Sequence, residues 1–167
     1  MVNMTVLTYP NPLLQKISLE VTRFDENLRR LVDDMLDTLY YDDGVGLAAN
    51  QVGVLQRVIV IDVSEDANSP QILINPKILS QTGLEKSKEG CLSVPDLYGE
   101  VERAAEICVE AQDLSGQRFR LDNVTGLFSR CIQHEIDHLN GKLYFDLLSP
   151  LKKQIMLKKL RKMACQT

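Results

Sequence analysis

The stretch "IQHEIDHLNG", residues 132–141, contains both histidines of the chain, His134 and His138, with Glu135 directly after the first. Apolar residues at helical spacing around it predict a helix from about residue 124 to 140. Residues four positions apart lie on one face of a helix, so the two imidazoles can bind one metal ion. The pattern H-E-x-x-H is typical of a catalytic metal site in which the glutamate is the general base. The sequence therefore predicts a metal-binding helix that still lacks a third ligand.

The side chains of this motif fall on the apolar side of the predicted helix. On a helical wheel, His138 and Glu135 lie within the apolar arc, and His134 lies at its edge. A carboxylate in an apolar stripe is costly unless its charge is paired or its pKa shifts. We therefore expect Glu135 to be buried with a raised pKa, as suits a general base beside a metal. The arc consists of Val124, Leu127, Phe128, Cys131, Ile132 and Leu139.

No third ligand follows the helix at the spacing of H-E-x-x-H peptidases. Tyr144 stands where one class has a third histidine. Another class uses a later glutamate, but the only acidic residue after His138 is Asp146. Upstream, Cys91 in "KEGCLSVP" is the best candidate, since two histidines and a thiolate leave a fourth position for water. Cys131 competes from the same helix, although three ligands on one helical surface would crowd the ion.

The remaining patterns predict secondary structure whose strands cluster instead of alternating with helices. This order favours an α+β fold, with a central metal-binding helix packed among antiparallel or mixed β-sheets and with N-terminal and C-terminal helices. Asp25 is the expected N-cap of the first helix. The expected elements are helices at about 25–42, 124–140 and 150–164 and strands at about 56–64, 71–79, 98–113 and 117–123, the last two as a hairpin around "DLSGQ".

Composition favours a soluble cytoplasmic enzyme with reduced thiols. The 167 residues are 44% hydrophobic and 25% charged, which fits one globular domain. No apolar run approaches the ~20 residues that span a bilayer, and the N-terminus lacks the pattern of a signal peptide. We therefore expect neither a membrane nor DNA as a partner. The four cysteines, Cys91, Cys108, Cys131 and Cys165, form no C-x-x-C pair.

Basic residues gather at the C-terminal end. Residues 149–167 carry six basic side chains and no acidic one, so residues 1–148 carry −10 of a net charge of −4. We expect residues 1–148 to be the catalytic part and residues 149–167 to be a basic helix of the same single domain. Such a helix is either a solvated face or a contact for an anionic partner, such as RNA or a membrane surface.

Three blocks, taken together, resemble the peptide deformylase family over nearly the whole chain. They are "GVGLAANQ" (44–51), "EGCLS" (89–93) and "HEIDH" (134–138), which look like the family's G-φ-G-φ-A-A-x-Q, E-G-C-φ-S and H-E-φ-D-H, with φ apolar. The segment "GKLYFDLLSPLKKQ" (141–154) resembles the bacterial form with a C-terminal helix. The glycines of the first block also match a dinucleotide-binding fingerprint, but the expected elements around them do not supply its strand and helix.

The resemblance implies an enzyme that removes the formyl group from N-formylmethionine at the N-terminus of nascent polypeptides and releases formate. It implies Cys91, His134 and His138 as ligands of one divalent ion per chain, Fe²⁺ in the cell, with Zn²⁺, Ni²⁺ or Co²⁺ able to substitute. A metal-bound hydroxide is expected to attack the formyl carbon, with Glu135 as general base and then general acid.

The same resemblance assigns residues around the metal. The Gln51 side chain and the Leu92 backbone N–H are expected to stabilise the developing oxyanion. Glu89 is expected to orient His134, and Asp137 is either a similar support or part of a structural ion pair.

The resemblance also implies a peptide-binding cleft. Val45 and Gly90 are expected to offer backbone hydrogen bonds to an extended peptide. Arg130 and Ser87 occupy positions near the methionine pocket that are often aliphatic in the family, and Arg130 would fold toward solvent or cover the pocket rim. The substrate-binding residues implied in this way are Val45, Gly46, Gly90, Arg103, Leu127 and Cys131.

In related bacterial enzymes, a basic C-terminal helix is associated with docking at the ribosome near the exit tunnel. Its basic side chains are therefore expected to contact rRNA phosphates. They are Lys152, Lys153, Lys158, Lys159, Arg161 and Lys162.

Two other functions are open to a chain with this motif. One is an H-E-x-x-H metallopeptidase that cuts internal peptide bonds, and the missing downstream ligand argues against it. The other is a catalytically silent relative that binds formylated peptides or a partner. The presence of Gln51, Cys91 and Glu135 together argues against that, because a silent relative has little reason to retain the base.

Overall fold

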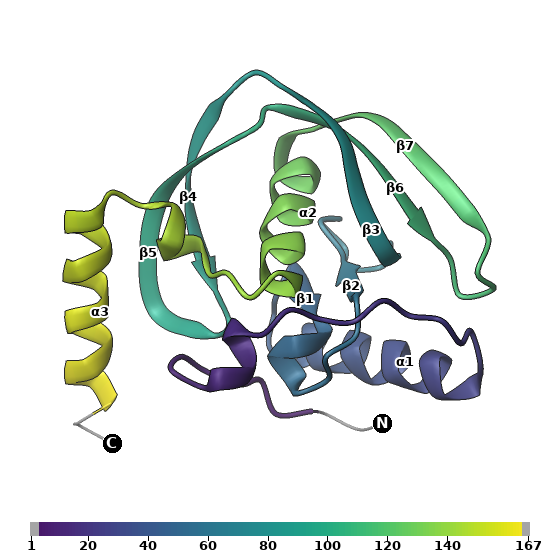
Figure 1. The fold of residues 1–167 in the computed structure, drawn as a ribbon, viewed down its shortest axis with the longest axis horizontal. Coiled ribbons are helices and arrows are strands. Elements are labelled where there is room, and N and C mark those ends of the chain that lie inside the picture. The colour runs from purple at the N-terminus through teal and green to yellow at the C-terminus, as the bar shows by residue number, and fades with distance from the viewer. Residues whose placement is uncertain (1–3, 165–167) are drawn as a thin grey trace.

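Two antiparallel sheets and three α-helices make up residues 4–164, the part of the chain that the computed structural model describes (Figure 1). Within that range Cys91, Cys108 and Cys131 are free thiols, as expected, whereas Cys165 lies outside the described residues. The elements are η1 Pro12–Gln15, α1 Glu26–Tyr41, β1 Gly46–Ala48, η2 Ala49–Val52, β2 Val58–Ile61, β3 Gln71–Thr82, β4 Glu85–Cys91, β5 Val94–Arg103, β6 Glu106–Gln112, β7 Arg118–Thr125, α2 Gly126–Leu139, η3 Tyr144–Leu147 and α3 Pro150–Ala164.

The larger sheet has five strands in the order β1-β2-β3-β6-β7, and every neighbouring pair is antiparallel. The smaller sheet is the hairpin β4–β5, which stands apart from it. In Figure 1, α2 runs through the middle of the molecule, with the hairpin on one side and the arch of β3, β6 and β7 on the other. This confirms the expected α+β fold around a central helix.

The buried strand β2 shows why the larger sheet has a helix on each face. Successive side chains of a strand point to opposite faces. Ile59 and Ile61 belong to the apolar cluster that contains α2, while Val58 and Val60 belong to the cluster that contains α1. All four side chains are buried, which explains why the sequence here is an unbroken β-branched run. The helix α2, which carries both histidines, is thereby fixed against one face of the sheet.

The basic helix α3 packs on the outer side of the hairpin, beside β5 (Figure 1). Met156 and Leu160 are buried in a third apolar cluster with Val94 and Val101. The division into residues 1–148 and a C-terminal helix of the same domain stays a prediction. Among the described residues, no helix has the length and apolar character needed to cross a membrane.

Most of the expected elements form close to their predicted positions. The first helix begins after Asp25, whose side chain accepts a hydrogen bond from the Leu28 amide at 3.2 Å. The hairpin β6–β7 closes at the expected turn, where the Asp113 amide donates to the Gln117 carbonyl at 2.9 Å. The strand expected at 98–113 is wrong in its extent, because the chain leaves one sheet after β5 and enters the other at β6.

Candidate active site

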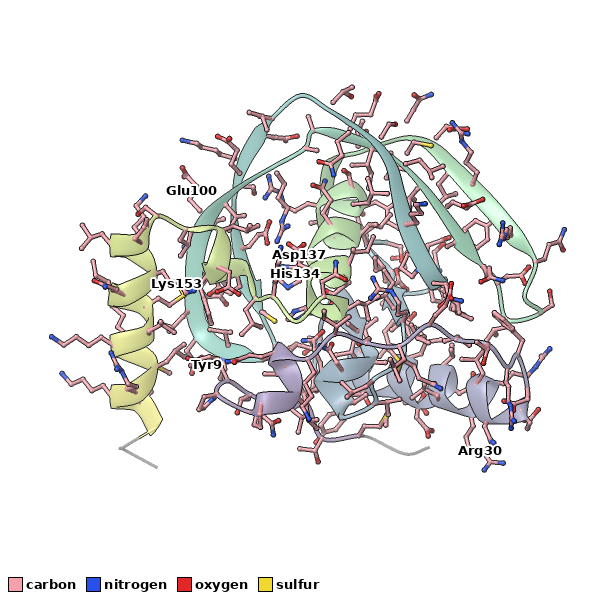
Figure 2. All side chains as sticks on the ribbon, viewed as in Figure 1. Tyr9, Arg30, Glu100, His134, Asp137 and Lys153 are labelled. Atoms are coloured by element: carbon pink, nitrogen blue, oxygen red, sulfur yellow. The ribbon has the colours of Figure 1, made fainter. Side chains whose placement is uncertain are left out.

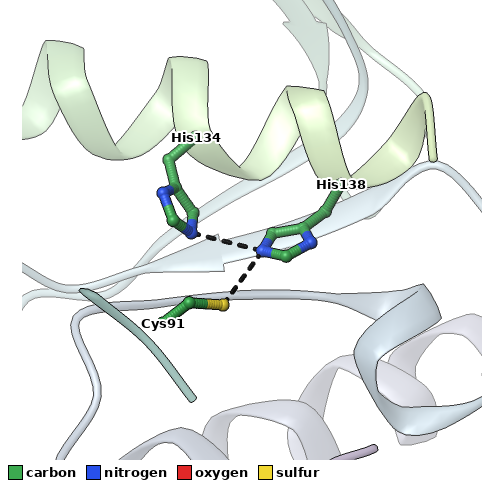
Figure 3. A group of neighbouring side chains, drawn as sticks. All are labelled: Cys91, His134 and His138. Atoms are coloured by element: carbon green, nitrogen blue, oxygen red, sulfur yellow. Dashed lines mark hydrogen bonds between the residues drawn. The ribbon is translucent and has the colours of Figure 1, made fainter. Parts of the chain in front are cut away.

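Three side chains from distant parts of the sequence meet beside α2. Cys91 lies at the end of β4, and His134 and His138 lie one turn apart on α2 (Figure 3). The Nε2 atom of His138 is 3.2 Å from both the Sγ atom of Cys91 and the Nε2 atom of His134. One ligand atom from each of the three lies within 4.8 Å of the other two. The structure thus brings together the three ligands that the sequence indicated.

The chemistry of these donor atoms fits a divalent transition metal. The Nδ1 atom of His134 lies 2.9 Å from the Oε1 atom of Glu89, and a neutral imidazole that donates from Nδ1 to this carboxylate has its lone pair on Nε2, the form that a metal binds. The Nε2 atom of His134 faces Nε2 of His138, which in turn faces the sulfur of Cys91, and electron-rich atoms at such distances favour a cation between them. Two imidazoles and one thiolate suit Fe²⁺ and Zn²⁺ better than Mg²⁺ or Ca²⁺.

The competing ligand candidate Cys131, and Tyr144 at the position of the missing third histidine, have other roles. Burial raises the pKa of the Cys131 thiol to about 12, which disfavours the thiolate that a metal requires, and the side chain faces the neighbouring cavity. Tyr144 is buried, and its ring stacks on His134 with 6.2 Å between centroids. Its hydroxyl donates to the Leu97 carbonyl at 3.1 Å. Tyr144 therefore supports a ligand instead of being one.

Glu135 is buried between α2 and β1. Burial raises the pKa of its carboxyl to about 7, against the opposite effect of the charges on His134 and Arg103. This agrees with the prediction of a raised pKa. A Cβ atom added at Gly46 would lie 2.7 Å from the Oε2 atom of Glu135, so only glycine lets β1 pass this close. The Oε1 atom is buried without a hydrogen-bond partner among the described residues.

The Gln51 amide is held in one orientation beside the ligands. Its Oε1 atom accepts from the Ala48 amide at 2.9 Å, and its Nε2 atom donates to the Ser93 hydroxyl at 3.1 Å. The same Nε2 atom lies 3.5 Å from the Sγ atom of Cys91. Leu92 lies in the turn between β4 and β5, directly after Cys91. Both expected oxyanion donors are therefore next to the candidate metal site.

A buried cluster of charges contacts His134, and Figure 2 labels two of the residues involved, His134 and Asp137. Glu89 accepts from Arg103 at 2.6 and 3.0 Å, from Arg130 at 2.6 Å and from His134 at 2.9 Å. Burial by itself raises the pKa of Glu89, but the hydrogen bonds from His134 and Arg103 and the Arg103 charge lower it to about 2. Arg103 also bonds to Asp137 at 2.8 Å. Asp137 is thus an ion-pair partner in the cluster that supports His134.

Two arginines differ from expectation. Arg103 is 5% exposed and does not line the cavity beside the ligands, so it holds Glu89 and is not placed to contact a peptide. Arg130 does not fold toward solvent, and it lines the cavity. Its guanidinium turns inward to Glu89 and to backbone carbonyls of the hairpin, because a buried carboxylate attracts it there.

A cavity of about 520 Å³ opens between β1, the hairpin and the first turns of α2. Its walls include His134 and Glu135, so it leads to the candidate metal site. The strand β1 is an edge strand of the larger sheet, which leaves backbone groups for an extended peptide. Five of the six expected substrate-binding residues line this cavity: Val45, Gly46, Gly90, Leu127 and Cys131.

Some functional contacts were not predicted from the sequence. The Asn50 side chain donates to the His138 carbonyl at 2.6 Å and joins the first sequence block to the end of α2. The only signal for this was the position of Asn50 beside Gln51. The stacking of Tyr144 on His134 had no sequence signal, because it depends on how the chain returns after α2.

Comparisons with known proteins agree with this geometry. The family profile described as polypeptide deformylase matches residues 3–154. A peptide deformylase of Pseudoalteromonas translucida is 49% identical over 164 residues, which cover 98% of each chain. A peptide deformylase of Alkalilimnicola ehrlichii is 48% identical and covers 96% of this chain and 90% of its own.

Solved structures show the same fold. A peptide deformylase from Legionella pneumophila superposes with a TM-score of 0.92 at 44% identity and covers 99% of this chain and 97% of its own. The Ehrlichia chaffeensis enzyme in complex with actinonin has a TM-score of 0.91 at 38% identity and covers 98% of each chain. These matches extend over nearly the whole chain and include all three sequence blocks. The chain is therefore a hydrolase that belongs to the polypeptide deformylase family.

Proposed function

We propose that the chain removes the formyl group from N-formylmethionine at the start of nascent polypeptides and releases formate. The observation that carries this is the convergence of Cys91, His134 and His138 at a cavity that also contains Glu135. The cavity lies beside an edge strand, so an extended N-terminus could place its first residue there. The names of the relatives support the same reaction.

The proposed mechanism assigns one task to each group. Cys91, His134 and His138 would hold a divalent cation, which would supply the Lewis acidity that lowers the pKa of a water and polarises a carbonyl oxygen. The Glu135 carboxylate takes a proton from the attacking water and returns it to the leaving amine. The Gln51 side-chain amide and the Leu92 N–H donate to the oxyanion. Burial of Glu135 keeps its pKa close to the operating pH, as this double task requires.

We propose Fe²⁺ as the metal in the cell, with Zn²⁺, Ni²⁺ or Co²⁺ as substitutes, since the donor set accommodates all four. The protein used in the test is prepared without oxygen and loaded with Fe²⁺. Formate release from formyl-Met-Ala-Ser is expected, and the acetylated peptide is expected to remain intact. Absence of formate would refute the proposal, while cleavage between Met and Ala would favour the metallopeptidase.

The ligand assignment has its own test. Cys91→Ala should lose or strongly weaken metal binding, measured by equilibrium dialysis. Cys108→Ala is the control, because Cys108 is also a free cysteine, is buried in β6 and takes no part in the site. Equal metal affinity of Cys91→Ala and the wild type would show that the ligand set is wrong.

We also propose a cytoplasmic location and contact of α3 with ribosomal RNA. Met156 and Leu160 face the protein, which leaves most basic side chains of α3 exposed. Binding to ribosomes should weaken with added salt and in a Lys158→Glu, Lys159→Glu variant, as measured by co-sedimentation. Binding that is indifferent to both would refute this contact.

A further inference from the structure

Arg130 is a charged residue in the wall of the substrate cavity. It lies on α2, one turn before His134, and lines the cavity together with Leu127 and Ser87. Its side chain is only 11% exposed. A buried charge is costly unless it is paired and hydrogen-bonded. The contacts of this guanidinium therefore indicate its role.

The guanidinium of Arg130 contacts both strands of the hairpin. Its Nη1 atom donates to the Oε2 atom of Glu89 at 2.6 Å and to the Val101 carbonyl at 3.0 Å. Its Nη2 atom donates to the Glu85 carbonyl at 2.6 Å. Glu85 and Glu89 belong to β4 and Val101 belongs to β5. One side chain of α2 therefore connects the central helix to both strands.

Such a connection fixes where the hairpin lies. The hairpin forms a two-stranded sheet separate from the larger one and packs its apolar side chains against α3, so its position relative to α2 depends on the polar contacts between the two. The cavity lies between this hairpin, β1 and α2, so the distance between hairpin and helix is also the width of the cavity. The planar fork of an arginine fixes this distance better than a lysine, whose ammonium is a single point of charge.

Charge balance keeps the guanidinium in this position. Within the cluster, Arg103 and Arg130 face the carboxylates of Glu89 and Asp137, which gives two charges of each sign. Without Arg130, one buried negative charge would be unbalanced, which is costly. Because both terminal nitrogens are engaged, Arg130 offers the cavity its methylene stem, an apolar and unbranched surface.

We propose that Arg130 is a specificity-determining residue, which ties the hairpin to α2 and so sizes the cavity for an unbranched apolar side chain. The inference rests on the proposed function, in which this cavity receives the side chain of the formylated residue. A cavity of fixed width admits methionine and penalises a bulky ring such as that of phenylalanine. The pairs Arg103–Asp137 and Glu89–His134 also join the hairpin to α2, so loss of the Arg130 contacts loosens the hairpin without detaching it. Contact with methionine then weakens and the penalty for phenylalanine falls.

The test compares kcat/KM for formyl-Met-Ala-Ser and formyl-Phe-Ala-Ser in the metal-loaded wild type and three variants. In Arg130→Met, we expect the ratio of the two values to fall by about tenfold, the lower end of what one methylene group contributes in an enzyme pocket. The loss should arise mainly from a higher KM for the methionine peptide. Arg130→Lys should give a smaller fall. Arg120→Met should leave the ratio unchanged, since Arg120 is exposed and pairs with Asp122 in the same strand.

Hydrogen exchange gives an independent readout in the same metal-loaded proteins. Backbone amides of β4 and β5 should exchange faster in Arg130→Met than in Arg120→Met, while those of β2 should not change. An unchanged substrate ratio, or an equal fall of kcat for both peptides, would overturn the inference, because Arg130 would then act through Glu89 and His134 alone. If Arg130→Met does not fold, an unchanged ratio in Arg130→Lys overturns it. Absence of formate release by the wild type would instead refute the proposed function.

Discussion

The two sides of α2 are held in different ways. On one side, Ile132 and Leu139 pack in an apolar cluster against the larger sheet. On the other side, Glu89 of the hairpin accepts hydrogen bonds from His134 and from two arginines. Apolar contacts are non-directional, whereas each buried polar contact depends on the position of its partner. Small substitutions should therefore be tolerated on the apolar side of α2 but not on the polar side.

The largest effect on activity is expected from a substitution of Glu135, the proposed general base. Glu135→Gln removes the proposed proton carrier without changing the shape of the side chain, so kcat should fall by about 10²–10⁴-fold. Metal content should stay at the wild-type level because Glu135 is not a ligand. Glu102→Gln, an exposed position of β5, is the matched control. A wild-type kcat in Glu135→Gln would show that Glu135 is not the proton carrier.

The next effect is expected on the polar side itself. Glu89→Gln takes the charge from the group that orients His134, so metal affinity should fall by about 10–100-fold. It also leaves Arg103 and Arg130 without their shared carboxylate, and breaking a buried pair costs about 3–5 kcal/mol of unfolding free energy. Metal titration and urea unfolding measure the two effects. If neither the metal affinity nor the free energy of unfolding changes, Glu89 does not hold the polar side of α2 in place.

A smaller effect is expected on the apolar side. Ile132 is fully buried, and Ile132→Val removes one methylene group, so the free energy of unfolding should fall by about 1 kcal/mol. Metal affinity and kcat should remain at wild-type values. A change in metal affinity as large as that of Glu89→Gln would show that the two sides are not independent.

The smallest effect is expected for an ion pair outside the buried cluster. Lys153 of α3 lies 2.7 Å from Asp146, with side chains that are 39% and 30% exposed (Figure 2). Lys153→Ala should change the free energy of unfolding by about 0–1 kcal/mol, and less at high salt. A loss as large as that of Glu89→Gln would mean that burial does not decide what these charge pairs contribute.

Local patterns were sufficient for the elements that carry a periodic apolar face or a continuous apolar run. The helices α1, α2 and α3, the strands β2 and β3 and the hairpin β6–β7 all carry such a pattern. By contrast, β4 was not predicted, because Glu85–Cys91 is polar and mostly exposed and becomes a strand only by pairing with β5. The strand β1 has three residues and begins with a glycine, so it carries no periodic signal.

The candidate site divides in the same way. His134, His138 and Glu135 could be recognised from their spacing, and the search for a third ligand led to Cys91. The positions of Arg103 and Arg130 could not be predicted, because the direction of a long side chain depends on which carboxylate the fold buries beside it. Sequence alone thus indicated the candidate ligands and the general base better than the arginines that support them.

The sequence separation between contacting residues of the site has a consequence for folding kinetics. The bond from Asn50 to the His138 carbonyl joins residues 88 positions apart, and the contact between Glu89 and His134 spans 45. Contacts of such sequence separation form late, because loop closure must first be overcome. Refolding followed by enzyme activity should therefore lag behind refolding followed by helix content. A chain that emerges during its own synthesis acquires a complete site only after α2 has been made.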